Sequence, residues 1–263
     1  MRIQWKCPAV VLAATFLAAC GGGGGEQTTQ TPAAKAAAKA PAAKAGPGGY
    51  AVEAVAGGGS VAGAVKYQGD APAAETIEIS KDTGVCGTKK VFETVSVGAG
   101  GGLANAVVWI DGISKGKDWG ALDGGTVDQH QCEYTPQVQI IKMGDELQIL
   151  NSDEVLHNIH AYHNDTETLF NLAQPIKGMK TPKTMDRSGP VHLKCDVHSW
   201  MSAWVFVANH PYYAVTGADG SFNLGDVPAG THKVKVWHQK LGEKSIDVTV
   251  EGGGSATADF TMP

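Results

Sequence analysis

The sequence predicts an all-β protein. Of its 263 residues 35 are glycine, and short runs of β-branched residues recur between turn signals such as GD, DG, SGP and PAG. Short strands separated by glycine- and proline-containing turns are typical of β-sandwiches and barrels. The formal net charge is −5 and lysine and arginine are scattered among acidic residues. Nucleic acid is therefore not an expected partner.

The N-terminus has the pattern of an export signal. Arg2 and Lys6 precede an apolar run over 8–19 that is too short to span a bilayer as a permanent helix. The run closes on LAAC, ending at Cys20, which resembles the bacterial lipobox. That resemblance implies a signal peptide over 1–19 and a lipid on Cys20; an ordinary signal peptide with an incidental cysteine is the alternative. We expect a lipoprotein anchored to a membrane in an oxidising compartment.

The segment after the signal predicts a lipidated, flexible tether over 20–49. It is rich in Gly, Ala and Lys and has no aromatic or large apolar residue with which to build a core. A flexible chain of this length reaches roughly 30 Å on average. Gly21, with no acidic residue at that position, resembles outer-membrane sorting in Gram-negative bacteria. That resemblance implies the periplasmic face of the outer membrane, or the cell surface, as the location.

The five cysteines suggest one disulfide and one free thiol. Cys7 leaves with the signal and Cys20 takes the lipid, so three remain. An odd number in an oxidising compartment leaves one thiol for another task. Cys86 and Cys132 lie in stretches flanked by Gly or Gln, with no chemistry around them, and we predict a disulfide between them, although sequence alone does not fix the pairing. Cys195 is then the free thiol.

Strand alternation places the candidate site residues. Residues 136–150 resemble a hairpin that turns at a GD dipeptide. In the next strand His157 and His160 point to opposite faces, because successive side chains alternate. In GPVHLKCD the same alternation puts Leu193 and Cys195 on one face. Cys195 thus lies at the inward end of a strand, and the chain then turns through DVHSWM before AWVFVA resumes as a strand.

The loop after this strand carries soft metal ligands. His198 and Met201 follow Cys195 at intervals of three, and a thiolate, imidazoles and a thioether suit copper better than zinc, magnesium or iron. A trigonal His₂Cys site with a weak axial Met needs a second histidine, which His157 supplies. The set His157, Cys195, His198 and Met201 therefore predicts one type 1 copper ion.

These segments resemble the cupredoxin family. GDELQILNSDEVLHNIHAY and VHLKCDVHSWMSAWVFV are similar to amicyanin and, more loosely, plastocyanin, over about 126–209. The resemblance implies a Greek-key β-sandwich with the same ligand roles. It also implies that the backbone of Asn158 helps to orient the cysteine sulfur. The family's proline beside the loop histidine is replaced here by Ser199.

A second resemblance covers the C-terminal part. YYAVTGADGSFNLGDVPAGTHKVKVWH, residues 212–238, resembles the carboxypeptidase regulatory-like, transthyretin-type sandwich, with a hairpin turn at its DG dipeptide. GGSVAGAVKYQGDAP and GGLANAVVWIDG resemble the opening strands of that fold. We expect 50–125 plus 210–263 to form one sandwich, packed on an inserted cupredoxin domain over 126–209. The alternative is an N-terminally elaborated cupredoxin with a small tail.

Outer-sphere electron transfer is the function that these residues favour. We expect His198 to be the partly exposed edge through which electrons pass, beside Trp200. Trp200 and Trp204 could form an apolar docking patch, with core packing as the alternative for both. Expected partners are redox proteins, such as a cytochrome or a dehydrogenase or oxidase, that dock transiently through small interfaces.

Three other functions are open to the same sequence. Copper delivery or storage would use the same residues and is the principal alternative. Copper oxidases and nitrite reductases need further His-x-His clusters, which the sequence lacks, and the paired-histidine strand of intradiol dioxygenases is also missing, so an enzyme is not expected. A purely structural role for copper would leave Cys195 unexplained.

Overall fold

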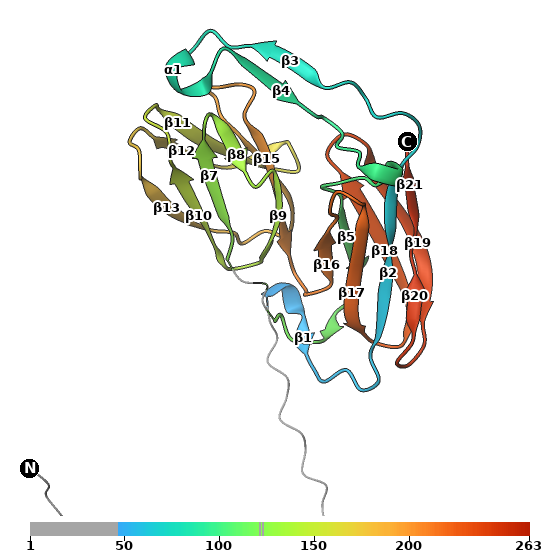
Figure 1. Cartoon of the computed structure of the whole chain (residues 1–263). Coiled ribbons are helices and arrows are strands. Elements are labelled where there is room, and N and C mark those ends of the chain that lie inside the picture. The colour runs from blue at the N-terminus through green and yellow to red at the C-terminus, as the bar shows by residue number, and fades with distance from the viewer. Residues whose placement is uncertain (1–46, 121, 123) are drawn as a thin grey trace, which may run out of the picture. The chain divides into compact units, whose positions relative to one another are not determined.

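The structure is a computed structural model that describes residues 47–263 apart from 121 and 123. The predicted signal peptide, Cys20 and nearly all of the predicted tether lie outside the described residues. Within them, no helix is long and apolar enough to cross a membrane. Almost all regular structure is β-strand (Figure 1), and the predicted all-β class is confirmed.

Two sheets facing one another form the first sandwich (Figure 1). A four-stranded sheet has the order β13-β10-β7-β8, and a five-stranded sheet has the order β12-β11-β14-β15-β9. Apolar side chains of both sheets, such as Ile149 and Leu193, meet in one core. The strands are β7 Thr126–His130, β8 Glu133–Thr135, β9 Val138–Lys142, β10 Glu146–Asn151, β11 His157–His163, β12 Glu167–Gln174, β13 Lys180–Thr184, β14 Gly189–Lys194 and β15 Ser202–Ala208.

The second sandwich is built from strands that precede and follow the first in sequence. One sheet has the order β16-β5-β18-β19, and the other places β2 between β17 and β20, with β21 also pairing with β2. The limits predicted for the two domains stay a prediction. The strands are β2 Gly59–Tyr67, β5 Val107–Asp111, β16 Tyr213–Val215, β17 Ser221–Val227, β18 Gly230–His238, β19 Gly242–Val250, β20 Ser255–Thr257 and β21 Phe260–Met262, with β1 Ala51–Val52 pairing with β6 Lys115–Gly116 beside them.

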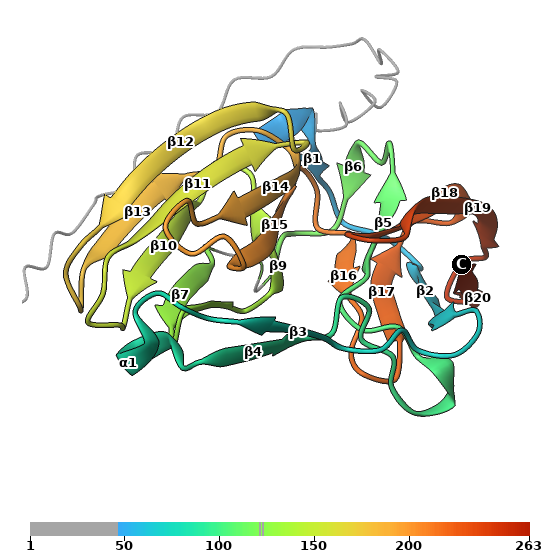
Figure 2. The same cartoon turned by 90° about the horizontal axis from the view of Figure 1, so that it is seen from above.

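A short ribbon stands apart from these sheets. Strands β3 (Glu75–Glu78) and β4 (Lys89–Phe92) pair only with each other among the described residues, and helix α1 (Thr83–Cys86) lies at the tip between them (Figure 2). We call residues 75–92 the strap. Although the strap precedes β5 in sequence, its buried residues Ile79 and Cys86 belong to the core of the first sandwich.

Strand β15 explains why the run AWVFVA is apolar throughout. Ala203, Val205 and Val207 face the core of the first sandwich. Trp204 and Phe206, on the opposite face, belong to a separate buried cluster with Trp109 of β5. A strand buried on both faces needs a continuous apolar run instead of an alternating one. Trp204 is only 6% exposed, so its predicted place in a docking patch is wrong and core packing holds.

Two predicted hairpins are wrong in their pairing. The chain does turn at Gly144, but β9 before the turn pairs with β15 while β10 after it pairs with β7 and β13. The DG turn at Gly220 likewise joins β16 and β17, which lie in different sheets. Each turn therefore carries the chain from one layer to the other. A turn signal gives the position of a reversal but not the partner of the strand that follows it.

Replacing Gly220 with alanine should destabilise the protein by about 3 kcal/mol. Gly220 has φ +74°, and a Cβ there would lie 2.2 Å from the carbonyl oxygen of Val65. Gly100→Ala is the matched control, since Gly100 has φ +71° with no atom near the added Cβ, and should cost only about 1–2 kcal/mol. Urea denaturation measures both variants, and equal losses would show that the close approach to Val65 relaxes freely.

Candidate metal centre

Two neighbouring strands and the loop after them position the predicted ligands. His157 begins β11, which pairs with β14, and Cys195 follows β14 directly. His198 and Met201 lie in the loop that leads into β15. All four side chains are buried: His157 and His198 are 0% exposed, Met201 is 2% and Cys195 is 3%. As predicted from alternation, Ile159 and Ala161 are buried with His157, whereas His160 is half-buried on the opposite face.

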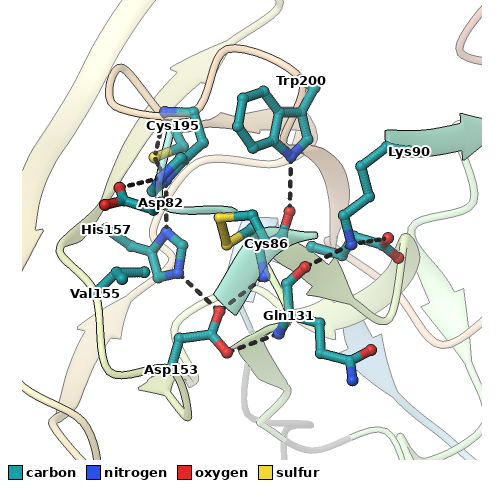
Figure 3. The surroundings of a disulfide bond; sticks show 12 residues. Asp82, Cys86, Lys90, Gln131, Asp153, Val155, His157, Cys195 and Trp200 are labelled. Carbon is teal, nitrogen blue, oxygen red and sulfur yellow. Dashed lines mark hydrogen bonds and ion pairs between the residues drawn. A yellow bond between two sulfur atoms is a disulfide. The ribbon is translucent and has the colours of Figure 1, made fainter. Parts of the chain in front are cut away.

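The two histidines and the thiol converge, and Figure 3 shows two of them, His157 and Cys195. The Nδ1 atoms of His157 and His198 are 3.0 Å apart, and Cys195 Sγ is 3.8 Å from His198 Nδ1. The candidate ligand atoms of these three residues all lie within 4.8 Å of one another. The predicted axial residue Met201 is joined to the loop by its backbone N–H, which donates to the His198 carbonyl at 2.9 Å, and its side chain lies in the same core as Cys195.

Each histidine is hydrogen-bonded through its Nε2 atom to a carboxylate. His157 Nε2 lies 2.9 Å from Asp153 Oδ2, and His198 Nε2 lies 3.0 Å from Asp82 Oδ2. A carboxylate only accepts hydrogen bonds, so each Nε2 carries a proton, and the two Nδ1 atoms are left facing each other, 3.0 Å apart inside the protein. Two imidazole nitrogens at this separation can both bind one cation.

The protonation state of His157 also suits metal binding. Burial lowers the pKa of His157 below its ordinary value of 6.5, and this outweighs the hydrogen bond that His157 donates to Asp153, which acts in the opposite direction. The imidazole is therefore neutral at pH 7, the form in which a histidine binds a metal ion.

Asn158 and the loop backbone surround the cysteine sulfur. Asn158 Oδ1 accepts from the backbone N–H of Asp196 at 2.7 Å and lies 3.3 Å from Cys195 Sγ. The backbone N–H of His198 donates to the sulfur at 3.4 Å. In the described structure it is thus the side chain of Asn158, not its backbone, that orients the cysteine. The sulfur is thus held between an N–H donor and the side-chain oxygen of Asn158, next to the two imidazoles.

A disulfide joins the strap to the first sandwich beside this centre. Cys86 in α1 is bonded to Cys132 in the turn between β7 and β8, with an S–S distance of 2.00 Å. The ligand atoms of Cys86, Cys132 and His198 lie within 4.8 Å of one another, so the disulfide packs directly against the loop histidine. Cys195 is the one free cysteine among the described residues.

The expectation that His198 forms an exposed edge is wrong. The strap covers it, and no part of its side chain reaches solvent. Trp200 is instead the nearby residue that reaches the surface: its ring centroid is 5.1 Å from that of His198, and its Nε1 donates to the Cys132 carbonyl at 3.0 Å. Trp200 is half-buried and lines an open groove of about 610 Å³ between the strap and the loop.

Asp82 and Asp153 were not among the residues expected from the sequence. Asp153 precedes His157 by four positions. The chain turns between the two residues, and this turn, which the sequence does not indicate, brings the carboxylate to the imidazole. Asp82 is separated from His198 by 116 residues. The one indirect sequence signal for Asp82 is its position four residues before Cys86, because the predicted disulfide brings that segment to the turn at Cys132.

The donor set fits a soft transition metal. A thiol and two imidazole nitrogens converge in a buried site, and Met201 is buried in the same core, which matches a Cys, His and Met ligand set. The other groups of His, Cys and carboxylate side chains close enough to hold an ion, within residues 47–263 without 121 and 123, share members with this one. The described part of the chain thus has a single candidate centre.

Comparison with known proteins supports the C-terminal assignment. Residues 202–263 match the carboxypeptidase regulatory-like domain. The predicted resemblance to this domain is confirmed, and the match begins one strand earlier than expected, with β15 of the first sandwich. None of the curated proteins compared with the chain matches it.

Solved structures similar to the chain include two cupredoxins and a copper enzyme. A purple cupredoxin from Nitrosopumilus maritimus is 21% identical, covering 32% of this chain and 99% of its own, with a TM-score of 0.29. Amicyanin from Paracoccus versutus is 19% identical, covering 33% and 82%, with a TM-score of 0.30. A Cu-containing nitrite reductase from Thermus scotoductus SA-01 is 18% identical, covering 33% and 23%, with a TM-score of 0.29. The metal assignment rests on the side chains of the centre.

Proposed function

We propose that the protein is a type 1 copper protein that carries single electrons between redox partners. The observation that carries this proposal is the approach of the two Nδ1 atoms to 3.0 Å, beside a buried thiol. His157, His198 and Cys195 would hold the ion, with Met201 as the weak axial ligand. When bound, copper supplies the one-electron Cu(II)/Cu(I) couple.

The surrounding residues keep this centre fixed and dry. Asp153 and Asp82 orient the two imidazoles, and the hydrogen bonds of Asn158 and the His198 N–H hold the sulfur in place. The near-complete burial of all four ligands excludes water. A site whose ligands move little between two charge states suits rapid electron transfer, because few atoms have to reorganise.

Trp200 is the residue through which we propose that the electron reaches the surface. Its ring packs beside His198 and also lines the groove by the strap. The groove gives a partner protein a place to approach this ring in a short-lived complex of small area. We propose a cytochrome, dehydrogenase or oxidase as the class of partner.

Copper delivery or storage is the competing function of the same residues. It requires the ion to leave, and burial of the ligands under a disulfide-bonded strap favours retention. We likewise propose that the chain is not an enzyme, since the candidate ligand groups in its described part gather around one enclosed centre.

The location of the protein is part of the proposal. A lipid on Cys20 and a flexible tether would keep the folded part near a membrane while it meets its partners, on the periplasmic face of an outer membrane or at the cell surface. The support comes from the sequence of the N-terminal segment.

Absorption and EPR spectra of the purified protein loaded with Cu(II) test the function. We expect an intense blue sulfur-to-copper charge-transfer band and a narrow copper hyperfine splitting, both lost in Cys195→Ser. His232→Gln is the control, because His232 lies on β18 of the second sandwich and outside the ligand set; its spectra should equal those of the wild type. A colourless copper complex with the spectrum of ordinary nitrogen and oxygen ligands would contradict electron transfer.

A further inference from the structure

Pairing between β3 and β4 does not by itself explain why the strap lies against the first sandwich. β3 and β4 pair only with each other in the described part of the chain, and an isolated two-stranded ribbon is marginally stable in water. Its tip nevertheless lies against the metal centre (Figure 3), with Cys86 only 3% exposed. Contacts other than sheet pairing must therefore hold the tip in place.

Three attachments converge on the metal centre and the turn beside it. The first is the disulfide between Cys86 and Cys132. The second is Lys90, whose Nζ donates at 2.6 Å both to the Gln131 carbonyl and to Glu133 Oε1. The third is the hydrogen bond from His198 Nε2 to Asp82. The strap is thus fastened to the β7–β8 turn on one side and to a candidate ligand on the other.

The conformation of Asp82 points to a specific task. Its backbone is left-handed, with φ 51° and ψ 37°, a region that few non-glycine residues adopt and that is often found at functional sites. Asp82 occupies the N-cap position of α1, where an aspartate usually bonds to the helix backbone. Here the carboxylate makes no such cap bond and instead accepts from His198. The N-terminus of α1 therefore has no side-chain cap, because the Asp82 carboxylate binds His198 instead.

We propose that the strap is a wall of the metal centre, with Asp82 as the positioning residue for His198 and the Cys86–Cys132 disulfide as the latch that keeps Asp82 there. This rests on the proposed function only for the identity of the metal. Asp82 fixes the Nε2–H tautomer of His198 and so directs Nδ1 toward Cys195 and His157. The strap also closes the side of the loop from which His198 would otherwise be open to solvent.

Retention of the metal ion is the consequence that can be measured. Loss of an outer hydrogen-bond partner of a metal-bound histidine typically lowers metal affinity about 10–100-fold. For Asp82→Ala we expect Cu(I) to pass to a phenanthroline-type chelator about ten times faster, or more. Asp82→Asn keeps a neutral acceptor and should fall between Asp82→Ala and the wild type.

The matched control lies on the strap itself. Glu78→Ala removes a carboxylate that pairs with Lys89 at the surface, where both side chains are well exposed. Its transfer rate should equal that of the wild type. The double variant Cys86→Ser/Cys132→Ser tests the latch, and it should release copper as fast as Asp82→Ala while keeping all the proposed ligands.

Two measurements on the full metal-free chain separate this proposal from the proposed function. Imidazole ¹⁵N NMR should show His198 protonated at Nε2 in the wild type and a mixture of tautomers in Asp82→Ala. Amide hydrogen exchange at Ile79 and Cys86, which donate within the strap, should be about ten times faster in the double serine variant, or more, because opening of the strap is no longer limited by the disulfide.

The results decide the proposal in either direction. If Asp82→Ala releases copper no faster than Glu78→Ala and His198 keeps its Nε2–H tautomer, Asp82 does not position the histidine and the proposal is overturned. If the wild type forms no blue copper site, the proposed function fails, and the tautomer and exchange measurements still decide the role of the strap.

Discussion

Replacing Asp153 with alanine is expected to destabilise the metal-free protein by about 4 kcal/mol. The carboxylate is 4% exposed and accepts three hydrogen bonds: from the backbone N–H of Gln131 at 2.7 Å, from that of Cys132 at 2.8 Å and from His157 Nε2 at 2.9 Å. Its removal leaves three donors without this partner, and two of them, on Cys132 and His157, belong to residues that are fully buried. Each unsatisfied buried donor costs about 1–3 kcal/mol.

The turn that Asp153 binds adds to this cost. Gln131 and Cys132 have φ of 50° and 59°, and two-residue turns of this kind usually contain Asn or Gly, which adopt positive φ more easily. Asp153 compensates for the strained backbone by binding both N–H groups at once. Without it, the turn that carries Cys132 loses its main support.

Urea denaturation of metal-free Asp153→Ala and wild type measures the loss. Asp145→Ala is the matched control, because that carboxylate is partly exposed and makes a long ion pair with Lys142, at 4.0 Å; it should cost under about 0.5 kcal/mol. Asp153→Asn should be intermediate, since its amide has one accepting atom where the carboxylate has two. A loss below about 1 kcal/mol for Asp153→Ala would show that water replaces the carboxylate.

Acid should destabilise the metal-free protein well before its carboxylates titrate. His210 and His238 are 3% and 1% exposed, and burial lowers the pKa of each from 6.5 to about 4. The unfolded state therefore binds protons from pH 6.5 downward, while these folded histidines stay neutral until about pH 4. The stabilisation is complete above pH 6.5 and is lost between these two values.

The expected size is about 2 kcal/mol for each histidine at pH 5, or about 4 kcal/mol for both. Burial also lowers the pKa of His157 and His192, and their contributions have the same sign. Urea denaturation at pH 7 and pH 5 gives the difference.

Glutamine variants assign this pH dependence to its source. His210→Gln and His238→Gln keep an acceptor for the backbone N–H groups of Tyr212 and Lys240 but cannot titrate. Each should remove about 2 kcal/mol of the difference between the two pH values, and together they should remove about 4 kcal/mol. A wild type equally stable at both pH values would show that the buried histidines accept protons without cost.

The parts of the site that sequence could predict are those set by local geometry. Alternation along a strand placed His157 and Cys195 inward, and a three-residue interval placed His198 and Met201 in the following loop. These relations depend on neighbours in the chain, so the residue pattern contains them. The burial of all four residues agrees with this local reasoning.

The parts that sequence could not predict depend on contacts between distant segments. Nothing near Asp82 indicates that its carboxylate leaves the helix cap for a histidine 116 residues away. The exposure of His198 was expected wrongly for the same reason, because the segment that covers it comes from outside the sandwich. Strand partners were similarly hidden: the GD turn at Gly144 is real, yet the strands on its two sides join different sheets.

The place of β2 in the second sandwich has a consequence for the order of folding. β2 pairs with β20 and β21, and the backbone N–H of Ala64 bonds to Asp259 across 195 residues of chain. Contacts of such high sequence separation are slow to form, because a long loop must close before they are gained. The strands β7 to β15 can assemble from one continuous segment. In contrast, β2 and β5 have strand partners only among β16 to β21, which lie at the C-terminal end of the described chain. Folding is thus expected to proceed from the middle of the chain outward.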